Sequence, residues 1–146
     1  MAERRIIVFQ DLAEVMPEVE RLVAGHSPAG NWSLAQICHH LGTTIRLTAR
    51  PVPEAGVPTA QQATLRDGFF GLGAFPNGRA SPAPFVPPEG LDLAKEAAAL
   101  GDAIKRFATA QGPFPAHPML GPLTGDQWHR FHTMHAAHHL GFVVPA

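Results

Sequence analysis

Disulfides, clusters of like charge and long apolar segments are all missing from this chain. Cys38 is the only cysteine among 146 residues, which excludes an intrachain disulfide and suits a reducing compartment. The formal charge is −1 without any run of like charges, so neither a nucleic-acid-binding surface nor an acidic tail is indicated. No apolar run could span a bilayer, and Ile6 to Phe9 is too short for a signal-peptide core. We therefore expect a cytoplasmic protein with no nucleic-acid partner and no membrane partner.

Histidine, by contrast, is abundant and clustered. Five of the nine histidines lie between His129 and His139, close to the end of the sequence. Histidine is the commonest metal-ligating side chain, and its ordinary pKa lies close to neutrality. The cluster therefore indicates metal binding, proton transfer or pH sensing, and the spacing of the histidines has to decide among them.

The composition predicts one domain over residues 1–146, because 45% hydrophobic residues can build a core without disulfides. Strand-like alternation is absent, whereas four segments have helical periodicity and end signals. Ser33 with Gln36, and Thr124 with Gln127, form capping boxes, and Asp11 caps the first segment. The predicted helices cover about residues 11–24, 33–49, 92–110 and 124–141.

The connections between these helices predict how they pack. Residues 51–90 hold eight of the fifteen prolines and are too long for a turn, so we expect a crossover with a short helix near residues 59–70. The other two connections are short, which predicts that helices one and two, and helices three and four, are antiparallel neighbours. The expected fold is an all-α four-helix bundle with a long Pro/Gly-rich crossover between helices two and three.

Two histidines of the last helix are candidate metal ligands. His135 and His139 lie one turn apart, within an apolar arc of roughly 100° that also holds aromatic residues. A third ligand would come from the second helix, where His40 borders the apolar stripe while His39 points away and reads as a surface residue. Cys38 lies roughly 160° from His40 around that helix, so we interpret it as a buried core thiol.

Three neutral imidazoles leave the full charge on a divalent ion and at least one coordination position open, as in catalytic sites. Zinc, nickel and iron(II) all accept such ligands. The competing interpretation is a set of core histidines that bond to their neighbours. His132, one turn before His135, is either a catalytic general base or a structural histidine. His138 is expected to be exposed or at a subunit contact.

The remaining polar and aromatic candidates each have two interpretations. His117 either lies at a pocket mouth or stabilises the turn before the last helix. Trp32 and Trp128 read as packing wedges at helix starts, and Trp128 could also wall a pocket. Arg46 and Arg79 are either anion clamps for a substrate carboxylate or ordinary surface residues.

Several segments together resemble the DinB/YfiT-like superfamily of four-helix bundles. They are residues 31–41 (NWSLAQICHHL) and residues 135–141 (HAAHHLG), while residues 117–124 (HPMLGPLT) with Trp128 resemble a bacterial branch catalogued as a domain of unknown function. The similarity extends from Arg5 to Pro145. It implies an up-down-down-up bundle with a metal held by His40, His135 and His139. Where many members continue with Arg-Gly-Gln, this chain has Leu-Gly-Phe at residues 140–142.

The resemblance and the histidine geometry lead to one main expectation, a metal-dependent hydrolase or thiol-dependent transferase. Its partner would be a small-molecule substrate, for which the resemblance suggests a low-molecular-weight thiol. The alternatives are a non-catalytic metal-binding or sensing protein, and a metal-free bundle whose histidines respond to pH. Association of bundle faces into a homodimer is compatible with each of these.

Overall fold

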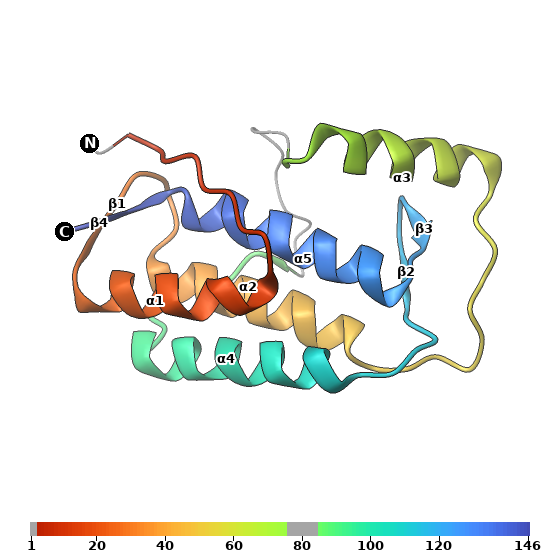
Figure 1. The fold of residues 1–146 in the computed structure, drawn as a ribbon. Coiled ribbons are helices and arrows are strands. Elements are labelled where there is room, and N and C mark those ends of the chain that lie inside the picture. The colour runs from red at the N-terminus through yellow and green to blue at the C-terminus, as the bar shows by residue number, and fades with distance from the viewer. Residues whose placement is uncertain (1–2, 76–84) are drawn as a thin grey trace.

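The computed structural model describes residues 3–75 and 85–146, and this part of the chain is mostly helical (Figure 1). Among these residues, no helix combines the length and apolar character needed to cross a bilayer. Arg79, one of the candidate anion clamps, lies outside the described residues. The helical elements are the 3₁₀ turn η1 (Leu12–Glu14) and the α-helices α1 (Val15–Ala24), α2 (Leu34–Thr48), α3 (Ala60–Leu72), α4 (Leu93–Thr109) and α5 (Gly125–Leu140).

The predicted helix starts are confirmed by their hydrogen bonds. The Ser33 hydroxyl accepts from the Gln36 amide at 3.1 Å, and the Gln36 side chain accepts from the Ser33 amide at 2.8 Å. Thr124 opens α5 with the same capping box. Asp11 caps η1, so the first helical segment begins as a 3₁₀ turn. Pro17 lies in the first turn of α1, where it replaces an amide that has no helical partner, and so it does not interrupt the helix.

Helices α1 and α5 run in one direction in Figure 1, and α2 and α4 run in the other. The most extensive helix–helix packing joins α2 to α4, which differs from the predicted pairing of consecutive helices. The two backbones come close at Gly42, where a Cβ atom would lie in ordinary contact with the Leu100 Cα, 3.5 Å away. The long connection between α2 and α4 frees these two helices to lie side by side and parallel.

The core lies between these four helices. The predicted apolar stripe of α2 is buried throughout, and Leu100 and Phe107 bring α4 into contact with it. Val23 of α1 is 41% exposed, although helical periodicity places it among the apolar positions of that helix. The largest fully buried apolar side chains are Leu22, Leu34, Ile37, Leu41, Ile45, Leu100 and Leu140.

Two short antiparallel ladders add a small amount of sheet that the sequence did not predict. β1 (His26–Pro28) pairs with β4 (Val143–Pro145), and β2 (Ala116–His117) pairs with β3 (Gly121–Pro122). Strands of two or three residues are too short to produce an alternating pattern, which is why the sequence read as all-α. The first ladder joins the end of α1 to the segment after α5.

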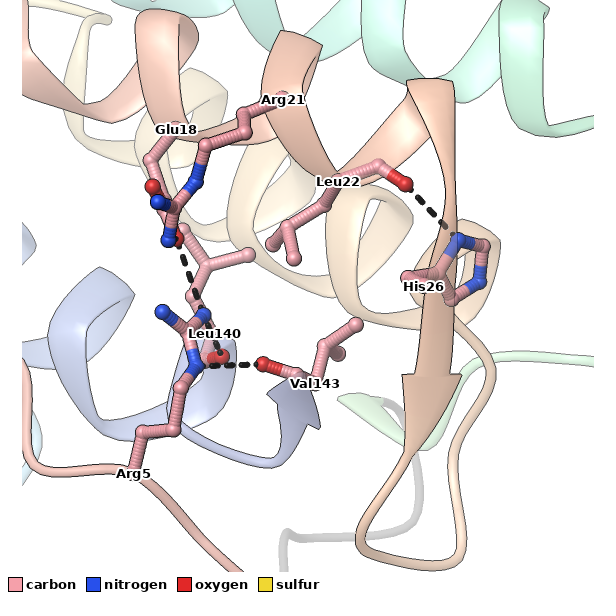
Figure 2. Close-up of polar contacts among 7 residues, drawn as sticks. All are labelled: Arg5, Glu18, Arg21, Leu22, His26, Leu140 and Val143. Atoms are coloured by element: carbon pink, nitrogen blue, oxygen red, sulfur yellow. Dashed lines mark hydrogen bonds and ion pairs between the residues drawn. The ribbon is translucent and has the colours of Figure 1, made fainter. Parts of the chain in front are cut away.

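Arg5 fastens the N-terminal segment beside that ladder (Figure 2). Its Nε donates to the Val143 carbonyl at 2.8 Å, and its Nη2 donates to the Leu140 carbonyl at 3.3 Å. The same Nη2 pairs with the Glu18 carboxylate of α1 at 2.9 Å. One side chain therefore connects the first residues, α1 and the end of α5.

The predicted short helix of the crossover is present as α3. In Figure 1 it lies apart from α1, α2, α4 and α5. Thr59 and Gln62 form its capping box. Phe70 is its buried residue, and the Arg130 side chain of α5 donates to the Phe70 carbonyl at 2.9 Å. The crossover is thus docked on α5 through the end of α3.

Candidate metal centre

Three histidines from two helices meet at one point in the interior. His40 comes from α2, and His135 and His139 come from successive turns of α5. Each offers a ring nitrogen, and these nitrogens lie within 4.8 Å of one another. The Nε2 of His135 is 3.0 Å from the Nε2 of His40 and 3.1 Å from the Nε2 of His139. The three histidines could therefore hold a metal ion.

The position of the protons favours an ion over a purely hydrogen-bonded cluster. The Nδ1 of His40 donates to the Phe85 carbonyl at 2.9 Å, so the Nε2 of the neutral ring carries a lone pair. A single proton on His135 Nε2 cannot point along both short contacts. The Nδ1 of His135 is buried without a hydrogen-bond partner among the described residues, and it would carry the ring proton if Nε2 bound an ion. A divalent cation would accept all three lone pairs at once, so the donor set fits such an ion.

Burial keeps the three rings in the ligating state. Removal from water lowers the pKa of His40 and lowers that of His135 further, and neighbouring histidines add to the effect at His135. For His139, burial and then the charges of His40, His138 and Arg4 lower the pKa to about 3. Neutral imidazoles bind metals and protonated ones do not, so the site is in its binding form at neutral pH.

Aromatic rings enclose the cluster. Trp32, just before α2, stacks on His139 with centroids 5.3 Å apart and an interplanar angle of 14°. It also lies 5.1 Å from the ring of His40. Phe75, after α3, lies 5.0 Å from His135. The sequence interpretation of Trp32 as a packing wedge missed this contact with two candidate ligands, and no local signal marked Phe75, because both approach across the fold.

His132 is not part of this group of three. Its Nε2 bonds to the Thr48 hydroxyl at 2.6 Å, and its ring stacks on Trp128 at 5.5 Å and meets the edge of Phe107 at 5.0 Å. The residue is 1% exposed, and burial, with a smaller contribution from His129, lowers its pKa to about 3. Its predicted role as general base stays a prediction.

Neighbours of the candidate ligands have more partners than the sequence indicated. His39, expected at the surface, is half-buried, and its Nδ1 lies 3.1 Å from the Glu96 carboxylate of α4. His138, expected to be exposed or at a subunit contact, is half-buried, and its Nδ1 accepts from Arg4 at 3.1 Å. Cys38 is the buried core thiol that was predicted, and burial followed by the charge of Glu96 raises its pKa to about 12.

Two other candidates have local roles. The Nδ1 of His117 accepts from the amides of Met119 and Leu120 at 3.0 and 3.1 Å, which supports the turn interpretation over a pocket-mouth role. The Arg46 guanidinium donates to the Thr43 hydroxyl one turn earlier on α2. Neither contact brings a charged group to the three-histidine cluster.

A family described as "Protein of unknown function (DUF1569)" matches residues 1–146, the whole chain. No curated protein and no solved structure matches it.

Proposed function

This chain belongs to the DUF1569 family, whose function is unknown, and from its histidine site we propose that it is a metal-dependent enzyme. His40, His135 and His139 would hold one divalent ion, such as zinc, nickel or iron(II). The proposed reaction is a hydrolysis or a thiol-dependent transfer on a small-molecule substrate. The observation that carries this proposal is the meeting of three histidine ring nitrogens from two helices within 4.8 Å.

When bound, a divalent ion supplies Lewis acidity toward a substrate oxygen, nitrogen or thiolate. The residues of the chain prepare for it. The Phe85 carbonyl holds the Nδ1 proton of His40 and so directs its Nε2 into the site. Trp32 fixes the plane of His139 by stacking, and Phe75 covers His135 from the crossover side. Apolar rings beside the site lower the local dielectric constant, which strengthens electrostatic interactions with a bound substrate.

We further infer an up-down-down-up four-helix bundle of the DinB/YfiT-like kind. The directions of α1, α2, α4 and α5 and the long connection between α2 and α4 support this inference (Figure 1). In such a bundle, ligands from facing helices project into a shared core. The position of His40 on α2 opposite His135 and His139 on α5 agrees with it.

For His132, the contacts favour the structural role over the catalytic one. The ring is enclosed by Trp128, Phe107 and Thr48. We therefore propose that it packs α5 against α4 and the end of α2, behind the cluster. A general base would instead lower the rate when replaced while leaving the free energy of unfolding unchanged.

Elemental analysis of natively purified protein tests the metal proposal. We expect about one equivalent of a transition metal per chain, and we expect His139→Ala to lose it, because two imidazoles bind far more weakly than three. His129→Ala is the matched control, since this histidine is on the same helix but lies outside the cluster, and it should retain the metal. A metal content that is negligible in the wild type, or equal in both variants, would contradict the proposal.

A second candidate function is non-catalytic metal binding or sensing. It is favoured by the aromatic cover of Trp32 over His139 and by the apolar Leu-Gly-Phe sequence at residues 140–142. Addition of azide to the metal-loaded protein separates the two functions. An open coordination position predicts a spectral change of the metal on azide binding, whereas a closed site predicts none.

A further inference from the structure

Arg4 places a permanent positive charge beside the three-histidine cluster. Its Nη2 donates to the Nδ1 of His138 at 3.1 Å and approaches the His138 carbonyl at 3.4 Å. The guanidinium also lies over the ring of Phe142, 4.7 Å from its centroid. The ring of His138 is in turn 4.9 Å from that of His139. A single side chain therefore separates this charge from a candidate ligand.

This charge is not neutralised by an acidic side chain among the described residues. Arg5, the next residue, pairs with Glu18 at 2.9 Å, and Arg66 pairs with Asp67 at 3.0 Å. Arg4 makes no such pair within residues 3–75 and 85–146, and its buried Nε has no hydrogen-bond partner there. A half-buried cation without a counter-charge has a desolvation cost that a bound anion would offset.

The cluster itself adds no negative charge. All three candidate ligands are histidines held neutral by burial, so an ion bound there would keep its positive charge. The charge of Arg4 is one of the causes that lower the pKa of both His138 and His139. The electrostatic potential at this end of α5 therefore favours a negatively charged ligand.

We propose that Arg4 is a specificity-determining residue that binds a carboxylate of the substrate while the reacting atom lies at the three histidines. A guanidinium forms charge-assisted hydrogen bonds with the planar carboxylate group, and one guanidinium matches a single negative charge. This inference rests on the proposed metal-dependent function and narrows its substrates to carboxylates. His138 positions Arg4 by accepting from it.

The competing role of Arg4 is structural, because its contact with the His138 carbonyl joins the N-terminal segment to the end of α5. Cobalt(II)-loaded protein distinguishes the two roles. The probes are 4-mercaptobenzoate and 4-mercaptobenzamide, which share the ring and the thiol and differ in charge. Binding is followed by the visible absorption bands of the cobalt ion.

The wild type should bind 4-mercaptobenzoate about tenfold more tightly than the amide. Arg4→Gln should remove this preference, mainly by weakening the carboxylate probe, and Arg4→Lys should retain part of it. Arg21→Gln is the control, since this arginine is exposed and pairs with Glu18, and it should leave the preference unchanged. High salt should reduce the preference in the wild type, which provides a measurement that needs no variant.

Equal affinity for both probes in the wild type, or an undiminished preference in Arg4→Gln, would overturn the role of Arg4 while leaving the metal site intact. If Arg4→Gln fails to fold, the salt dependence of the wild type decides instead. A preference for 4-mercaptobenzoate that does not fall at high salt would then overturn the role of Arg4. Failure of cobalt to bind at all would instead remove the proposed function, and the assignment of Arg4 with it.

Discussion

At the scale of single residues, a backbone carbonyl determines which nitrogen of His40 is free. The Phe85 carbonyl accepts the Nδ1 proton, and this leaves the Nε2 lone pair directed at His135. The stacked ring of Trp32 likewise orients the ring of His139. The candidate ligands are thus oriented by residues that the spacing of histidines does not reveal, because Phe85 and Trp32 act across the fold.

The depressed pKa of His132 predicts a pH dependence of stability. The unfolded chain binds a proton near pH 6.5, whereas the folded ring resists protonation until about pH 3. The contribution of the neutral His132 ring to the free energy of unfolding is therefore complete above pH 6.5. It is lost progressively as the pH falls from there toward 3. His132→Gln should flatten this part of the curve, as measured by urea unfolding of metal-free protein between these pH values. If the free energy of unfolding of the variant had the same pH dependence as that of the wild type, the lowered pKa of His132 would be contradicted.

At the scale of elements, α2 carries both a candidate ligand and the principal packing surface of the fold. Its start was predictable because the capping box of Ser33 and Gln36 is a local signal. Its partner helix was not, because α2 packs against α4 across a long connection and neither helix carries a local signal of that pairing. The partner of His39 could not be predicted for the same reason, because no local pattern in α2 or α4 indicates its contact with Glu96.

Removal of the α2 cap should weaken both the fold and the site. Ser33→Ala should lower the free energy of unfolding by about 1 kcal/mol, because the Gln36 amide at the helix start loses the hydroxyl that accepts its hydrogen bond. It should also weaken metal binding, since Trp32 and His40 lie on either side of this turn.

Thr59→Ala removes the same kind of cap from α3 and is the matched control. It should leave the metal affinity unchanged in a competition titration with a chromogenic chelator. Equal losses of metal affinity in the two variants would contradict the link between the α2 cap and the site.

At the scale of the whole molecule, the two ends of the chain are connected. The β1–β4 ladder and the contacts of Arg5 join α1 and the N-terminal segment to the end of α5 (Figure 2), the helix that carries His139. The sequence predicted the long helices and the three histidines, because periodicity and capping are local. It did not predict the contacts of Arg4 and Arg5 with the end of α5 and with β4, or the β1–β4 ladder, because these partners are more than a hundred residues apart in the chain.

Arg5 should contribute more to stability than an exposed arginine that contacts the same carboxylate. Arg5→Gln loses two carbonyl contacts and a half-buried ion pair, and we expect a loss of about 2 kcal/mol in urea unfolding. Arg21→Gln removes only an exposed contact to Glu18 and should change stability by less than about 0.5 kcal/mol. Equal effects of the two substitutions would contradict this role of Arg5.

The central claim is that one ion binds between α2 and α5 through imidazole nitrogen. X-ray absorption at the K edge of the metal in natively purified protein tests it most directly. The account predicts the scattering pattern of three imidazoles with one further light ligand and no sulfur, since the ring nitrogens of His40, His135 and His139 converge and Cys38 is buried elsewhere on α2. A sulfur ligand, fewer than three imidazoles in the wild type, or the loss of an imidazole in His129→Ala, would contradict it.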